Sequence, residues 1–211
     1  VTFKIIQELK ELGAKYTLGL VENDQELFNN VFKGIFAFYI LERFNFMSSF
    51  ATTFIIPEAY NGLMMNSAKT ILKIALDELI HWQVGEYVIK HLITSDPRGK
   101  IALEQTKEEL LKIIEEAYQA ELKWSDFILS EGREVVGLNS NLLKEYVTWN
   151  AENVMYTLGF SDKIPGDLPL KFMVNWLDID AVQHANQESS NNNYKLNTVI
   201  NDLDSLDLDD F

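Results

Sequence analysis

Four long segments with helical composition make up most of this sequence, and none contains a proline before its last residue. They are residues 24–57, 58–93, 101–129 and 140–158. A proline within an α-helix removes a backbone hydrogen bond and clashes with the preceding turn, so each segment can form one uninterrupted helix. No segment with alternating Val, Ile or Thr competes as a strand. Long helices joined by short turns predict an all-α helical bundle.

The residues around these segments carry signals for helix ends. Residues 2–12 have apolar side chains at helical spacing, and we expect this shorter helix to end at Gly13. The second long helix should stop before the Asp96-Pro97 pair, because the residue before a proline disfavours the α conformation. Asn139 or Ser140 is expected to cap the last long helix.

The composition is that of one globular domain. The chain has 211 residues, of which 47% are hydrophobic, with only four prolines and ten glycines. This is enough apolar material for a single sizeable core with mostly regular structure. We expect the bundle to occupy residues 1–159.

Charge and cysteine content exclude several classes of protein. A net charge of -14 argues against a nucleic-acid partner, since phosphate backbones are held by clustered Lys and Arg. The absence of cysteine excludes disulfides, thiolate metal sites and cysteine nucleophiles. No apolar run is long enough to span a bilayer, and the first residues do not resemble a signal peptide. We therefore expect a soluble cytoplasmic protein with no membrane partner, in the host cytoplasm if the chain is phage-encoded.

The character of the sequence changes after residue 159. Residues 160–186 combine prolines with large apolar side chains, and we expect them to form an irregular strap packed on the bundle. Residues 187–211 are rich in Gln, Ser, Asn and Asp, which predicts a disordered acidic tail. An induced turn in this tail would present four apolar residues together to a groove on a partner: Leu203, Leu206, Leu208 and Phe211. The alternative is a tail that only adds solubility.

Glu78 and His81 are the strongest candidates for chemistry. On a helix, residues three apart share one face, so this pair can ligate metal from a single side. Ferritin-like bundles build a two-metal centre from one Glu on each of two helices and a Glu-x-x-His pair on each of the other two. Glu42, on another long helix, adds a single carboxylate. Glu42, Glu78 and His81 together therefore make up half of such a site.

The surroundings of Glu42 favour the metal-ligand interpretation. Glu42, Phe46, Phe50 and Phe54 recur at four-residue spacing, which places a carboxylate at the head of a phenylalanine stripe. Burying an unpaired acid there is costly, and a metal or a protein cation would remove that cost. The alternatives are a surface acid for Glu42 and a core or capping histidine for His81.

Several ordered motifs resemble one known family. LERFNFMSSFA at residues 41–51 and ILKIALDELIH at residues 71–81 are similar to the second half of the small, radical-generating β subunit of class I ribonucleotide reductase. EYVTW at residues 145–149 resembles a later helix of that family, and residues 172–176 resemble its connection into the tail. The resemblance covers nearly the whole chain and is greatest for phage-encoded members. It implies an enzyme component for deoxyribonucleotide synthesis.

The resemblance also implies roles for residues near the proposed metal site. Glu42, Glu78 and His81 correspond to three of the six metal ligands of the family. Three further residues correspond to the apolar pocket around the radical site: Phe46, Phe50 and Ile74. The implied cofactor is a pair of iron ions, with manganese or a mixed manganese and iron pair as alternatives.

Other positions resemble the family's radical path and its subunit contacts. Asp77 corresponds to the aspartate that links the metal region to the path, and Glu188 and Tyr194 correspond to its relay toward the large subunit. Residues 201–211 correspond to the peptide that docks on the large subunit. A dimer of completed small subunits is expected.

The remaining ligands, the usual radical tyrosine and the tryptophan relay of the family have no counterpart in this sequence. We expect a split or truncated subunit that a second polypeptide, the N-terminal half, completes; self-association of two copies is the alternative. Two other classes stay open, namely a different ferritin-like di-iron oxidase component and a metal-free regulatory or assembly bundle.

Overall fold

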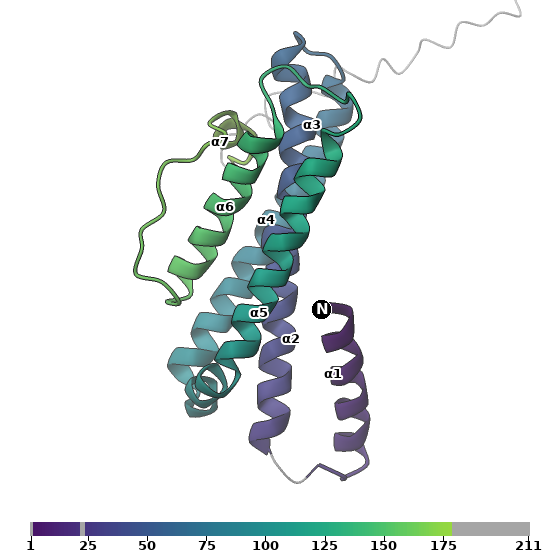
Figure 1. Ribbon diagram of the computed structural model, residues 1–211. Coiled ribbons are helices and arrows are strands. Elements are labelled where there is room, and N and C mark those ends of the chain that lie inside the picture. The colour runs from purple at the N-terminus through teal and green to yellow at the C-terminus, as the bar shows by residue number, and fades with distance from the viewer. Residues whose placement is uncertain (1, 22–23, 179–211) are drawn as a thin grey trace, which may run out of the picture. The chain divides into compact units, whose positions relative to one another are not determined.

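The computed structural model describes residues 2–21 and 24–178, which form seven helices and no strand within those ranges. The helices are α1 (Thr2–Thr17), α2 (Asp24–Phe44), α3 (Met47–Ala59), α4 (Met65–Ser95), α5 (Pro97–Ile128), α6 (Ser140–Thr157) and α7 (Phe172–Trp176) (Figure 1). The prediction of an all-α bundle is confirmed for this part of the chain. None of the described helices is long and apolar enough to cross a membrane.

Helix α2 is central to the packing within residues 1–177. It contacts α1, α4 and α5, and α5 in turn contacts α4 and α6. Figure 1 shows α2, α4 and α5 side by side as long rods, with α1 against one end of α2. Helices α2 and α4 run antiparallel, because Tyr39 lies against Gly85 while Glu42, further along α2, lies against His81, earlier on α4.

Two apolar clusters form the core. The first joins α2, α4, α5 and α6 through residues such as Phe36, Ile89 and Leu110. The second lies around α3 and brings in Leu143 of α6 and Trp176 of α7. Helices α2 and α4 therefore have one side fixed in the core, where burial of large apolar side chains holds them in place.

The expectation of one helix over residues 24–57 is wrong, because the chain breaks at Asn45 and Phe46, between α2 and α3. The hydroxyl of Ser48, in the first turn of α3, is hydrogen-bonded to the hydroxyl of Ser125 on α5 at 3.1 Å. The first turn of α3 is therefore anchored to another helix. The phenylalanine rings remain in contact along α3 despite the break. The ring centroids of Phe46 and Phe50 lie 6.2 Å apart, and those of Phe50 and Phe54 lie 6.0 Å apart.

The second long helix begins at Met65 rather than at residue 58. Between α3 and α4 the backbone takes positive φ at Asn61, Gly62 and Met64, with values of 51°, 85° and 57°. Such left-handed conformations end a helix, and Asn and Gly adopt them most readily. The turn reverses the chain so that α4 returns along α2.

Helix α1 does not end at Gly13 as expected but continues to Thr17. The glycine with a positive φ after this helix is Gly19, at +67°. The end of α4 agrees with expectation, since it stops at Ser95 before the Asp96-Pro97 pair. Helix α5 then starts at Pro97 itself rather than at residue 101, because proline is favoured in the first helical turn and Asp96 accepts a hydrogen bond from Arg98 N at 2.9 Å.

Asn139 caps α6 as expected, accepting a hydrogen bond from Leu142 N at 2.9 Å. Between α6 and residue 178, where the described part of the chain ends, the backbone is irregular apart from the short α7. Trp149 donates its indole N–H to the carbonyl of Gly166 at 2.8 Å, which ties the irregular segment to α6. Residues 187–211, expected as a tail, lie outside the described residues.

Candidate metal centre

Three polar side chains from α2 and α4 meet at one point between these helices. Glu42 lies in the last turn of α2, and Glu78 and His81 lie near the middle of α4. The spacing of three residues places Glu78 and His81 on one face of α4, as the sequence predicted. Packing of α2 against α4 then brings Glu42 to the same point.

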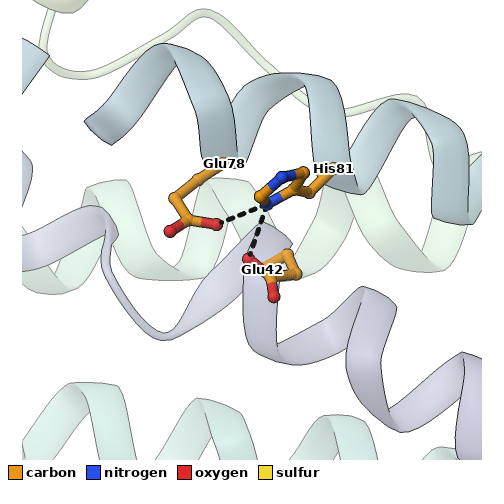
Figure 2. Close-up of side chains that lie close together, drawn as sticks. All are labelled: Glu42, Glu78 and His81. Atoms are coloured by element: carbon orange, nitrogen blue, oxygen red, sulfur yellow. Dashed lines mark hydrogen bonds and ion pairs between the residues drawn. The ribbon is translucent and has the colours of Figure 1, made fainter. Parts of the chain in front are cut away.

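The distances within the cluster suit a shared ion. His81 Nδ1 lies 3.1 Å from Glu78 Oε2 and 3.6 Å from Glu42 Oε2. One ligand atom from each residue falls within 4.8 Å of the others. Figure 2 shows the imidazole between the two carboxyl groups, one from each helix. A single divalent cation can therefore contact all three side chains after small rotamer adjustments.

The pKa values of the two carboxyl groups shift in opposite directions in a partly buried setting. Burial is the largest cause that raises the pKa of Glu42, to about 7, followed by its hydrogen bond to Glu78 and the charge of Glu78. The hydrogen bond with Glu42 is the largest cause that lowers the pKa of Glu78. The hydrogen bond between His81 and Glu78 is the largest cause that raises the pKa of His81. A metal cation between two carboxyl groups this close would relieve their mutual repulsion.

One side of the cluster faces solvent. The side chain of His81 is 58% exposed, whereas Glu42 and Glu78 are 23% and 18% exposed. Two carboxylates and an imidazole form a donor set suited to iron or manganese. Three protein ligands leave coordination positions open on the solvent side. The residues present therefore fit part of a metal site, with room for further ligands.

The apolar residues expected around the site have different environments. Phe50 is buried and Phe46 is half-buried, in contact with each other at the start of α3. Ile74, one turn before Glu78 on α4, is exposed. Asp77 is also exposed, on the same side of α4 as Ile74 by its helical position.

The structure adds neighbours that the sequence did not indicate. Arg43, directly after Glu42, places its guanidinium over the ring of Trp82, directly after His81. Gly85, one turn after His81, allows the close approach of α4 to Tyr39 on α2. Neither contact has a local sequence signal, because each depends on how two distant helices pack. Glu188, Tyr194 and residues 201–211 lie outside the described residues.

Comparison with known proteins gives the family of the chain. The sequence profile for "Ribonucleotide reductase, small chain" matches residues 2–167. The chain belongs to the ribonucleotide reductase small chain family. The all-α architecture is accordingly that of the ferritin-like bundle of this family, and helices α2 and α4 lie within the matched region.

Individual relatives agree with the family match. Ribonucleoside-diphosphate reductase 1 subunit beta of Salmonella typhimurium is 29% identical over 197 residues, covering 91% of this chain and 51% of that protein. The subunit beta of Haemophilus influenzae is 30% identical, covering 81% and 46%. The subunit beta of Enterobacteria phage T4 is 28% identical, covering 85% and 47%. The present chain therefore spans about half the length of the relatives that it matches.

Proposed function

We propose that this chain contributes one half of the di-metal centre of a ribonucleotide reductase small subunit, with Glu42, Glu78 and His81 as metal ligands. The observation that carries the proposal is the convergence of these three side chains, from two helices, to within 4.8 Å of one another. Membership in the small chain family supports it, as does the raised pKa of Glu42 beside Glu78.

The proposed cofactor is a pair of iron ions, with manganese or a mixed pair as alternatives. When bound, the metal pair supplies the oxidising power that generates the radical for ribonucleotide reduction. Glu42 and Glu78 supply negative charge and oxygen donors, and His81 supplies a nitrogen donor. The hydrogen bond between His81 and Glu78 sets the orientation of the imidazole before metal enters.

The remaining ligands are proposed to come from polypeptide equivalent to the half of the relatives that this chain does not cover. The exposed apolar side chains on the ligand helices support a covering partner. On α4, Ile74 lies seven residues before His81 and therefore on the same face, and it is 48% exposed. On α2, Phe38 lies four residues before Glu42 and is 46% exposed. A helical segment carrying carboxylate and imidazole ligands would cover both residues and close the open side of the site.

We propose a separate polypeptide, the N-terminal half of the small subunit, as the source of that segment, and a dimer of completed subunits as the assembly. Asp77 lies on the face to be covered, which suits its proposed place in a radical path. Glu188 and Tyr194 are proposed to continue that path, and residues 201–211 to dock on the large subunit.

Metal analysis tests the ligand assignment. The purified chain, alone and after co-expression with the N-terminal half, is loaded with Fe²⁺ and its metal content is measured after removal of free ion. We expect Glu78→Ala to abolish retention, because it removes a ligand atom and its charge. Glu86→Ala, two turns further along the same helix, is the matched control and should retain metal.

The same experiment separates the competing assemblies. Two irons per heterodimer, and fewer in the chain alone, support completion by a second polypeptide. Two irons per copy in a symmetric dimer of this chain would replace the second polypeptide by self-association. Absence of metal in every combination would overturn the catalytic proposal and leave a regulatory or assembly bundle.

A further inference from the structure

Arg43 and Trp82 form a contact between the two ligand-bearing helices, immediately beside the ligands. Arg43 follows Glu42 on α2, and Trp82 follows His81 on α4. The guanidinium carbon of Arg43 lies 4.7 Å from the centroid of the Trp82 ring. At this distance the cation attracts the face of the indole. The two helices are therefore joined at the position next to the convergence of the proposed ligands.

A buried amide on a third helix also binds the guanidinium of Arg43. Arg43 Nη1 donates to Asn150 Oδ1 on α6 at 2.5 Å. Asn150 is buried, and its Nδ2 donates to the carbonyl of Tyr146 at 2.8 Å, which orients its oxygen toward Arg43. Within the described ranges no ion pair includes Arg43. The guanidinium is therefore held by an aromatic face and an amide rather than by a carboxylate.

Trp82 is held mainly by its ring. The indole packs against the core cluster of α2, α4, α5 and α6. Its Nε1 is buried and has no hydrogen-bond partner within the described part of the chain. A buried donor without a partner is costly, so ring packing and the Arg43 contact must outweigh that cost to keep the indole in place.

We propose that Arg43, Trp82 and Asn150 are positioning residues that hold α2 and α4 at the separation at which Glu42, Glu78 and His81 can bind one ion. The inference rests on the proposed function of those three residues as ligands. Metal ligands must be held close to their productive geometry by neighbouring packing and hydrogen bonds. The Arg43–Trp82 contact lies directly next to the proposed ligands on both helices.

Two substitutions remove the contact from either side. The Co²⁺ affinity of the full chain is measured by titration and by the visible absorption of the bound ion. Arg43→Ala and Trp82→Leu are each expected to weaken Co²⁺ binding about tenfold, the usual size of effect for groups that orient ligands. Trp82→Phe keeps an aromatic face and should retain most of the affinity. The double variant should bind no more weakly than the weaker single variant, because both changes break one contact.

Phe28→Leu provides a matched control. Phe28 lies on α2 beneath the guanidinium of Arg98, again at 4.7 Å, at the far end of the helix from Glu42. The substitution removes an equivalent contact between α2 and α5 without touching the ligand region. It is expected to lower the melting temperature while leaving Co²⁺ affinity unchanged. Equal losses of affinity in Phe28→Leu and Trp82→Leu would overturn the proposal, because they would reflect general loosening.

A metal-free measurement tests the contact independently of the proposed ligands. Hydrogen exchange is followed in peptides covering residues 39–46 and 78–85. Arg43→Ala should accelerate exchange in both peptides, and Phe28→Leu in neither. Unchanged exchange together with unchanged affinity would overturn the positioning role. Undiminished Co²⁺ binding in Glu78→Ala would instead overturn the ligand assignment, and the exchange data would still decide whether Arg43 holds the helices together.

Discussion

Gly85 on α4 lies directly against Tyr39 on α2, so closely that a Cβ at Gly85 would be 3.2 Å from the Cβ of Tyr39. Tyr39 is buried and lies one turn before Glu42, while Gly85 lies one turn after His81. The two helices therefore pass close to each other beside the proposed ligands, where a side chain on Gly85 would push them apart.

Gly85→Val is expected to lower metal affinity about tenfold, since a displaced helix moves Glu78 and His81 away from Glu42. It should also lower the free energy of unfolding by about 1–3 kcal/mol through overpacking. Metal titration and urea denaturation measure the two effects. Gly13→Val is the control, because a Cβ at Gly13 meets nothing within 4 Å. Unaltered metal affinity in Gly85→Val would show that the site tolerates a wider helix separation.

Trp176 stacks on Phe54 with ring centroids 4.6 Å apart and planes 2° apart, and it donates its indole N–H to Glu58 at 2.9 Å. We expect Trp176→Ala to lower the free energy of unfolding by about 3–5 kcal/mol, as for other buried aromatic residues. Trp176→Phe keeps the stack and loses the hydrogen bond, at a cost of about 1 kcal/mol. Urea denaturation followed by circular dichroism measures both. Equal stability of the Ala and Phe variants would contradict a structural role for the stack.

Glu121 makes stability depend on pH. Burial raises its pKa from the ordinary 4.5 to about 7, although hydrogen bonds from Ser48 oppose the rise. The folded chain therefore binds this proton more tightly than the unfolded chain does. The free energy of unfolding contributed by Glu121 is highest at low pH and falls as the pH rises from 4.5 to about 7.

Glu121→Gln removes this dependence. Relative to the unsubstituted chain, the variant should gain stability between about pH 5 and about pH 7.5, by at most about 3 kcal/mol. Denaturation curves across this range measure the difference. Glu108→Gln, at an exposed position of the same helix, should follow the unsubstituted chain at every pH. A constant difference between Glu121→Gln and the unsubstituted chain would contradict a raised pKa.

Tyr194 provides a test of the proposed radical path. In a complex reconstituted with the N-terminal half and the large subunit, Tyr194→Phe should leave metal content and the radical signal unchanged, because it lies outside the ligand set. Nucleotide reduction should be lost, since phenylalanine has no phenol to oxidise. Product formation and electron paramagnetic resonance measure the two. Tyr156→Phe, at an exposed tyrosine of α6, should retain turnover, and full turnover in Tyr194→Phe would remove Tyr194 from the path.

The helices themselves were largely predictable because their signals are local. The Asp96-Pro97 pair marked the end of α4, and Asn139 marked the start of α6. The break between α2 and α3 was not predictable from composition, because the hydrogen bond of Ser48 to Ser125 on α5 joins residues far apart in the sequence. No property of the neighbouring residues announces a bond made across such a distance in sequence.

The candidate site likewise has one part that the sequence predicts and another that depends on tertiary structure. The pairing of Glu78 with His81 follows from helical periodicity alone, since residues three apart share a face in any α-helix. The approach of Glu42 to that pair, the Arg43–Trp82 contact and the close passage at Gly85 were decided by tertiary structure. They depend on the register and separation of two antiparallel helices, which are set by the burial of their apolar sides in a common core and not by the residues next to the ligands.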